Sequence, residues 1–261
     1  MPADLYNVAI DMAGRQGSIT LGRGDEMIAT HDLPDTRKPP RHRIALIPAI
    51  DQLLGEQAVR PQQLDQVYLS IGPGSFTGLR IAVTTAKTLA QALNVRLVAV
   101  PTLDVIVHGQ THGSPTETPP PHLAVCLNVK GDTCYTGLYQ RQEATWIATQ
   151  PPAVMSWDQV MSTAPRPLAI LADQWPNEFA QQTPAGVTWL GRPPLTRGSE
   201  SVWQLGRHAA RKQQFTDPTT LLPLYVRPPE AEVLWRQRQA GSAPGRSPQH
   251  AGGAPKLAKN G

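Results

Sequence analysis

The stretch that decides the fold is QVYLSIGPGSFTGLRIAVTTAKTLAQALNVRLVAV, residues 66–100. Its two short apolar runs, 66–71 and 96–100, predict strands. Between them, apolar residues recur every three or four positions along 77–94, which predicts a helix with one apolar face. The segment is therefore expected to form a strand, a loop, a helix and a second strand.

The loop between the first strand and the helix is rich in glycine, which raises the question of a phosphate site. Gly72, Gly74 and Gly78 match neither the dinucleotide-binding fingerprint nor the P-loop. A turn is expected at the Gly-Pro-Gly sequence, because proline fixes φ and glycine readily adopts positive φ. Ser75 or Thr77 is expected to cap the helix by accepting a hydrogen bond from a first-turn amide.

The rest of the chain repeats one order of elements: three strands, then alternating helices and strands. In the first half we expect strands at 6–11, 17–22 and 26–31 and helices at 40–56 and 103–110. In the second half we expect strands at 123–128, 133–139, 145–150, 167–173 and 186–190, and helices at 156–163, 176–182 and 199–215.

This order indicates an internal duplication, in which VAID (8–11) and VCLN (125–128) occupy matching places. Three antiparallel strands followed by helix–strand alternation is the order of a ribonuclease-H-like unit. Two such units predict an α/β fold of the actin, Hsp70 and sugar-kinase type with two lobes. The expected domains are a first lobe at 1–110, a Pro-rich linker or loop at 111–122, a second lobe at 123–235 and a disordered basic tail at 236–261.

Composition predicts a globular protein. Apolar residues make up 40% of the 261 residues, and no apolar run reaches the roughly 18 residues of a membrane span. The start, MPADLYNVAIDMAG, lacks the features of an export signal, so a cytoplasmic protein is expected. The net charge is +4, but the tail 236–261 holds five basic and no acidic residues, which leaves −1 for 1–235.

The two cysteines, Cys126 and Cys134, are expected to be buried free thiols, as is usual in the cytosol. If the segment between them forms a hairpin, they could instead face each other across it. His108 and His112 have the H-x-x-x-H spacing that puts two imidazoles on one helix face. Gly109 weakens a helix there and no third ligand is evident, so no metal site is predicted.

The residues of a nucleotide site are also incomplete. In a nucleotide-binding protein of this fold, the first strand of each half ends near a carboxylate, and Gly, Ser or Thr then hold phosphates. Here Asp11 is followed by Met12 and Ala13, and the matching position in the second half is Asn128. Both loops are interpreted as degenerate and Asp11 as a structural hydrogen-bond acceptor. No catalytic residue and no cofactor is expected.

Three segments closely resemble the TsaB (YeaZ) family. They are the loop and helix within 71–106, which carry the family's G-P-G-S-F-T-G-L-R, the first helix at 41–54, and the C-terminal signature at 223–232. The resemblance covers roughly residues 6–235. It departs from the family at Arg43-Ile44, where a Ser-Glu pair is usual, and at Asn128-Val129-Lys130, where members often carry an Asp-Ala-Arg-type segment.

The resemblance implies a function. TsaB is the non-catalytic partner of TsaD, which transfers a threonylcarbamoyl group to the adenosine 3′ to the anticodon in tRNAs that read ANN codons. It implies a heterodimer with a TsaD-type subunit, contact with a TsaE-type ATPase through the complex, only an indirect relation to tRNA, and pairing with a second copy when TsaD is absent. TsaD carries a metal-binding H-x-x-x-H where this chain has the histidine-free segment 101–106.

The resemblance also implies where the partner binds, because the first two helices of the family form a helical bundle with those of TsaD. The exposed side of helix 77–94 is expected to be small, at Gly78, Ala82, Thr85 and Leu89, so that a second helix approaches closely. The expected interface residues are Ile44, Ile47, Gly74, Ser75, Phe76, Thr77, Gly78, Leu79, Ala82, Val83 and Ala86. The apolar residues of the two helices are expected to divide between the interface and the core, and they are Ile44, Ile47, Ile50, Leu54, Leu79, Ala82, Val83 and Ala86. Phe76 is either an anchor for the partner or part of the core.

Three other functions stay open at this point. An actin-fold ATPase or sugar-kinase-like phosphotransferase needs an acid in the second hairpin and hydroxyls in the first, which are missing. A metallopeptidase needs a ligand set that the sequence lacks. RNA binding through the tail predicts salt-sensitive tRNA binding that deletion of 236–261 abolishes.

Overall fold

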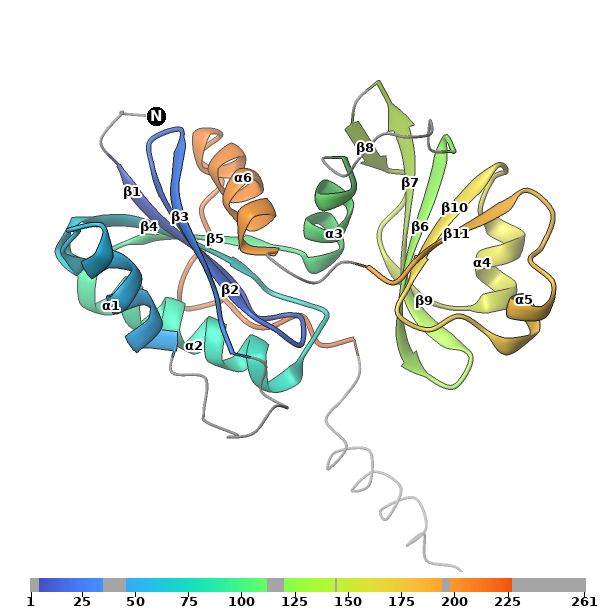
Figure 1. Cartoon of the computed structure of the whole chain (residues 1–261), viewed down its shortest axis with the longest axis horizontal. Coiled ribbons are helices and arrows are strands. Elements are labelled where there is room, and N and C mark those ends of the chain that lie inside the picture. The colour runs from blue at the N-terminus through green and yellow to red at the C-terminus, as the bar shows by residue number, and fades with distance from the viewer. Residues whose placement is uncertain (1–4, 35–45, 112–119, 144, 194–197, 227–261) are drawn as a thin grey trace, which may run out of the picture. The chain divides into compact units, whose positions relative to one another are not determined.

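The computed structural model describes residues 5–34, 46–111, 120–143, 145–193 and 198–226 (Figure 1). The first half contains strands β1 (Tyr6–Asp11), β2 (Ser18–Arg23), β3 (Glu26–Asp32), β4 (Leu64–Ser70) and β5 (Arg96–Val100). Its helices are α1 (Leu46–Glu56), α2 (Phe76–Leu93) and α3 (Thr102–Thr111), with one 3-10 turn at Pro61–Gln63.

The second half contains strands β6 (His122–Lys130), β7 (Thr133–Gln142), β8 (Thr145–Ala148), β9 (Ala153–Ser156), β10 (Leu168–Ala172) and β11 (Val187–Gly191). Its helices are α4 (Trp157–Thr163) and α5 (Asn177–Gln181), and α6 (Gly198–Arg211) follows. None of the described helices is long and apolar enough to cross a membrane.

The two halves form two sheets that share one order of five strands, and the second sheet has a sixth strand, β9, which pairs antiparallel with β7. The first sheet has the order β3-β2-β1-β4-β5, and the second, read from its β8 edge, has the order β8-β7-β6-β10-β11. In each sheet the first three strands pair antiparallel, and the last two run parallel to the first strand of that half. The duplication and the α/β fold class are therefore confirmed.

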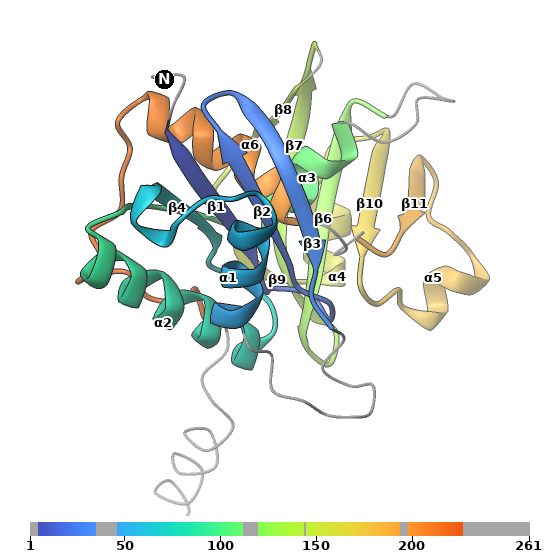
Figure 2. The same ribbon diagram turned by 60° about the vertical axis from the view of Figure 1, so that its left-hand side comes forward.

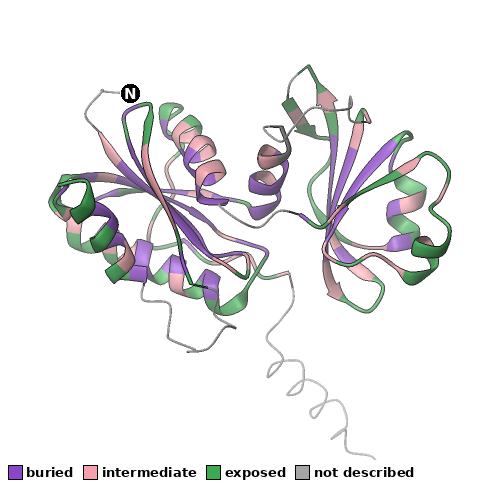
Figure 3. Ribbon diagram, viewed as in Figure 1, coloured by how far each residue is buried: buried purple, intermediate pink, exposed green. Residues whose placement is uncertain are grey.

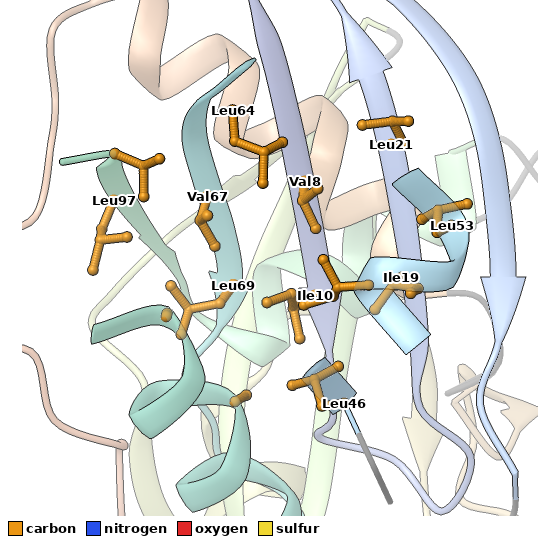
Figure 4. Packing of buried hydrophobic residues seen from close by; sticks show 14 of the residues in the cluster. Val8, Ile10, Ile19, Leu21, Leu46, Leu53, Leu64, Val67, Leu69 and Leu97 are labelled. Atoms are coloured by element: carbon orange, nitrogen blue, oxygen red, sulfur yellow. The ribbon is translucent and has the colours of Figure 1, made fainter. Parts of the chain in front are cut away.

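Helices cover both faces of the first sheet (Figure 2). On one face, α1 and α2 pack over aliphatic strand residues such as Val8, Ile10 and Leu69, each of which is fully buried (Figure 4). On the other face lies α6, whose Trp203 donates a hydrogen bond from Nε1 to Asn7 of β1. Because α6 comes after the second half in the sequence, the chain returns to the first sheet before residue 226.

Helix α3 contributes to two cores. Its Val105 packs with α6 and β5, whereas Leu103, Ile106 and Val107 pack against one face of the second sheet. The other face of that sheet is covered by α4 and α5 with an aromatic cluster. Figure 3 shows the central strands β6 and β10 mostly buried, whereas α5 has no buried residue.

The ends of α1 and α2 have recognisable local causes, and the cap expected at Ser75 is present. Ser75 caps α2, because its Oγ accepts a hydrogen bond from the amide of Gly78 at 3.2 Å. Asn94 ends the same helix in the left-handed conformation. Pro48 lies in the first turn of α1, where its missing amide would have no acceptor within the helix.

A few expectations differ from the structure. Strand β9 was not predicted, because only four residues follow Pro151-Pro152 before α4 begins. The strand expected at 145–150 ends at Ala148, and the helix expected at 199–215 ends at Arg211. Most of the linker 111–122 and the whole tail 236–261 lie outside the described residues, so the lobe boundaries stay predictions.

Candidate functional site

The Gly-rich loop packs tightly against the turn that follows β1. The amide of Ser75 donates a hydrogen bond to the carbonyl oxygen of Ala13 at 2.8 Å. A Cβ atom on Gly74 would lie 2.5 Å from that same oxygen, and a Cβ on Gly78 would overlap the carbonyl oxygen of Met12. Two of the glycines are therefore needed because backbone meets backbone here, and the turn after β1 covers one side of the start of α2.

The first glycine of the loop meets a segment from the end of the described chain. Gly72 has φ of +115°, and a Cβ on it would lie 2.7 Å from the carbonyl oxygen of Leu224. The amide of Leu224 donates to the carbonyl oxygen of Ile71 at 2.7 Å. The ring of Tyr225 then lies on Phe76, with 4.9 Å between ring centroids. The loop is therefore held from two sides by segments distant in sequence.

Asp11 is enclosed within the fold. Its Oδ1 accepts hydrogen bonds from the hydroxyl of Ser70 and from the amide of Ala13, at 2.5 and 3.0 Å. The first residue of α6, Gly198, lies so close that a Cβ there would overlap Oδ2. Burial raises the pKa of Asp11, and the hydrogen bonds from Ser70 and Ala13 oppose that shift. This environment agrees with a structural acceptor and leaves no room for a phosphate beside the carboxylate.

The matching loop of the second half is a local hairpin. The amide of Asn128 donates to Oδ1 of Asp173 at 2.8 Å, and its side-chain Nδ2 donates to the carbonyl oxygen of Gly131 at 3.3 Å. Asp173 follows β10, and the sequence had not indicated its role. The backbone N–H and the side-chain amide of Asn128 therefore both stabilise the turn.

Part of the predicted interface lies at the surface. Ile47 on α1 is 54% exposed and Phe76 at the start of α2 is 40% exposed. Gly74, Ser75 and Thr77 are also exposed. Because α1 and α2 contact each other, these residues belong to one pair of neighbouring helices.

The other part of the predicted interface is buried, and the expectation of a small exposed side on α2 is wrong. The buried residues are Gly78, Leu79, Ala82, Thr85, Val83 and Ala86. They face the first sheet because the close approach of α2 to Met12 and to the strands requires small side chains there. Leu89 is half-buried, and Ile44 lies outside the described residues. A charge at Ala82 would therefore disrupt the core.

Two residues that were not among the predicted interface residues contact the ring of Phe76, and Leu222 precedes one of them by three positions. The guanidinium of Arg80 lies over the Phe76 ring, 5.0 Å from its centroid. Tyr225, 40% exposed, lies on the same ring, and Leu222 is 71% exposed. We call the set Ile47, Gly74–Thr77, Arg80, Leu222 and Tyr225 the docking face. The segment 223–232 was the sequence signal for Tyr225, and nothing in the sequence indicated Leu222.

The remaining candidate residues show no assembled site. Cys126 and Cys134 are buried free thiols, as predicted, and the hydroxyl of Thr136 lies 3.8 and 3.2 Å from their sulfur atoms. His108 lies on α3, and His112 is outside the described residues. Within the described ranges, no three His, Cys, Asp or Glu side chains are grouped in a way that could hold a metal ion.

Comparison with known proteins gives concordant matches. The model of the family described as TsaD, tRNA N6-adenosine threonylcarbamoyltransferase, matches residues 37–188. The tRNA threonylcarbamoyladenosine biosynthesis protein TsaB of Bacillus subtilis (strain 168) is 28% identical over 239 residues, 89% of this chain and 98% of that protein. The protein of the same name from Escherichia coli (strain K12) is 23% identical over 76% of this chain and 78% of its own length.

A solved structure shares the fold. YeaZ from Pseudomonas aeruginosa superposes with a TM-score of 0.69 and 22% sequence identity, over 85% of this chain and 100% of that chain. The likeness extends over both sheets of the described part, since it covers all of that protein.

Proposed function

Because this chain belongs to the tRNA N6-adenosine threonylcarbamoyltransferase family and is a TsaB/YeaZ member of it, we propose that it is a non-catalytic subunit that binds and activates a TsaD-type subunit. It has a role in the biosynthesis of threonylcarbamoyladenosine in tRNA. In this proposal the TsaD-type subunit transfers the threonylcarbamoyl group to the adenosine 3′ to the anticodon of tRNAs that read ANN codons. The reaction takes place in the cytoplasm.

One observation carries the proposal: the carboxylate that would have to help hold a nucleotide already makes hydrogen bonds within the protein and is covered by it. The Asp11 carboxylate is bonded to Ser70 and Ala13 and covered by Gly198. A general base or metal ligand needs a free lone pair directed at the reacting group. The enclosure of Asp11 supports a subunit that acts through binding rather than an actin-fold ATPase or phosphotransferase.

The docking face is the surface proposed for the TsaD-type partner. Ile47, Phe76 and Tyr225 expose apolar or aromatic area beside the guanidinium of Arg80. Aromatic residues and arginine are the residue types that most often dominate the binding energy of an interface. Helices α1 and α2 would pair with two helices of the partner, or with a second copy of this chain when the partner is absent. A TsaE-type ATPase and the tRNA would be reached through the complex.

The test is a titration of this chain with the TsaD-type subunit of its own organism, followed by light scattering. A defined heterodimer is expected. Ile47→Glu should weaken it by about thirtyfold or more, since a central apolar contact is typically worth about 2 kcal/mol. The matched control is Ile147→Glu on β8, because Ile147 is similarly exposed at 45% and lies in the second sheet.

Circular dichroism would verify that both variants stay folded. Equal affinity of the two variants would remove the docking face from the proposal. Failure of the unmodified chain to bind at tens of micromolar, or rapid ATP hydrolysis by the chain alone, would contradict the proposed role as a binding subunit.

A further inference from the structure

A cavity of about 490 Å³ lies where α3 meets the second sheet. Its wall includes Leu103 and Asp104 from α3, Tyr135 and Tyr139 from β7, and the turn after β8. A volume of this size is within the range of about 300–1,000 Å³ that is usual for small-molecule sites. Neither the family resemblance nor the docking face assigns a role to it.

The cavity wall has one acidic side chain, Asp104, and no basic one. Asp104 stands in the first turn of α3 and is half-buried. Among the described residues no basic side chain pairs with its carboxylate. Burial raises the pKa of Asp104, whereas its neighbour Tyr139 lowers it. A carboxylate in such a place gains from a cation that reaches it, because burying an unpaired charge is costly.

A second polar group in the wall, the hydroxyl of Tyr139, is buried with the Asp104 carboxylate as its neighbour. Tyr139 is only 4% exposed, and its hydroxyl is buried beside Asp104 without reaching good hydrogen-bonding geometry with any described group. Gly137, two residues earlier on the same strand face, makes room for this hydroxyl, since a Cβ there would lie 2.8 Å from it. Buried polar groups without partners are rare in folded proteins, so each one requires a reason.

The rest of the wall excludes anionic ligands. It contains no lysine, arginine or histidine, and four of its residues are prolines, which offer no amide donor. Its remaining polar side chains, Thr149 and Gln150, are uncharged, so the lining offers a phosphate or carboxylate no positive charge. Leu103, Ala148 and Leu224 add apolar surface. The lining therefore suits a hydrogen-bond donor with a positive charge on an apolar body.

We propose that this cavity is a binding site for a small organic amine, whose ammonium group lies against Asp104 and Tyr139 while its apolar part packs among the prolines and Leu103. Tyr135, on the same face of β7 and half-buried, offers an aromatic face to the cation or to the apolar part. The proposal goes beyond the binding of a TsaD-type partner and does not depend on it.

The test is a calorimetric titration of the full chain with three probes of similar shape: phenethylamine, its neutral analogue phenethyl alcohol, and the anionic hydrocinnamate. A panel of further aryl- and alkyl-amines would follow phenethylamine. The amine should bind about tenfold or more tightly than the alcohol, since a hydrogen bond to a charged group is worth about 1.5–3 kcal/mol. Hydrocinnamate should not bind.

Two variants place the site. Asp104→Asn should reduce amine affinity by about tenfold or more while leaving the weak affinity for the alcohol unchanged. Ala148→Trp, at an exposed lining position, should fill the cavity and abolish binding of both. The matched control is Asp132→Asn, because Asp132 is exposed on the same sheet's hairpin and outside the cavity wall.

Two results would overturn the proposal. One is that no amine of the panel binds at concentrations up to about 10 mM, where even fragment-sized ligands of a true site are detected. The other is amine binding that survives both Asp104→Asn and Ala148→Trp. Binding of the Asp104→Asn variant to the TsaD-type subunit is measured separately. If the variant still forms the heterodimer, a failure of the amine site is distinguished from a failure of the docking face.

Discussion

The two halves of the molecule share one strand order but cover their sheets in different ways. Helices α1 and α2 of the first half have 11 and 18 residues, whereas α4 and α5 of the second half have 7 and 5. The second half fills its core with large rings instead, from Trp157, Trp175 and Phe179. The same strand order can therefore be stabilised without a long helix. The length of α2 is more than the packing of such a sheet requires.

The loops that follow the first strand of each half also differ, in how deeply they are buried. In the first half, the loop is enclosed by α2 and α6, and Asp11 is buried under Gly198. In the second half, Asn128 is half-exposed and bonds only to its own hairpin and to Asp173. In the first loop the acidic residue is enclosed by packing, and in the second loop an asparagine stands where an acid would be needed. Neither loop therefore resembles one that holds phosphate.

The largest effect is expected from Trp157→Ala. Trp157 is 7% exposed and lies edge-on to Trp175 and Phe179, at 5.6 and 6.1 Å between centroids. Its removal should cost about 4 kcal/mol, because large cavities in aromatic cores are expensive. Urea unfolding monitored by circular dichroism measures the loss.

Trp189→Ala serves as the control, since Trp189 stacks on Trp175 but is 45% exposed, and it should cost only about 1 kcal/mol. At a temperature where Trp157→Ala stays folded, it should still bind the TsaD-type subunit. A loss of binding without unfolding would mean that the second half takes part in docking.

The next largest effect is expected from Gly78→Ala in the first half. The added Cβ would overlap the carbonyl oxygen of Met12, so the loop and α2 must separate. The free energy of unfolding should fall by about 2 kcal/mol, which lowers Tm by roughly 4–8 °C. Calorimetry measures the change.

Gly55→Ala on α1 is the matched control, because a Cβ there meets nothing within 4 Å. It should raise stability by about 0.5–1 kcal/mol, as expected for glycine in an exposed helix. A similar gain in both variants would show that Gly78 acts only as a poor helix former and not as a contact point.

Most elements could be predicted from the sequence, because short apolar runs alternate with periodic ones and Gly or Pro separates them. The direction in which α2 faces could not. Its small residues Gly78, Ala82 and Ala86 fit an internal contact as well as an external one, and the choice depends on Met12, 66 positions before Gly78. The contact between the rings of Tyr225 and Phe76 joins residues 149 positions apart, and no local pattern encodes it.

A smaller effect is expected from Asp11→Asn, which makes the first loop resemble the second. Burial raises the pKa of Asp11, so the folded state holds the proton more tightly than the unfolded chain does. Ionisation of Asp11 costs no stability below the pKa that Asp11 has in the unfolded chain. The cost grows as the pH rises from that value toward the higher pKa of Asp11 in the folded protein. The variant should therefore gain stability relative to the unmodified chain between acidic and neutral pH, by about 1 kcal/mol at neutral pH.

Asp217→Asn gives a control of opposite sign. Hydrogen bonds from the amide and hydroxyl of Thr219 lower the pKa of Asp217, so its ionised form stabilises the fold above the unfolded pKa. That variant should lose stability at neutral pH and none at acidic pH. Chemical denaturation at several pH values measures both. A large loss for Asp11→Asn at neutral pH would mean that ionised Asp11 holds the loop together.

The smallest effect on stability is expected from Arg80→Ala, at the junction between the fold and the docking face. Arg80 is exposed, and its guanidinium lies 5.0 Å from the Phe76 centroid. An exposed contact of this kind is worth about 0.5–1 kcal/mol, so Tm should fall by only a few degrees at most. The affinity for the TsaD-type subunit should fall far more, by about tenfold or more, because the contact is desolvated in the complex.

Arg96→Ala is the matched control, because it removes a similar contact at 4.2 Å from the Phe215 centroid. It should change stability by a similar amount and leave the affinity for the partner unchanged. If the two variants reduce affinity equally, the exposed face of α2 is no more than a solvated surface.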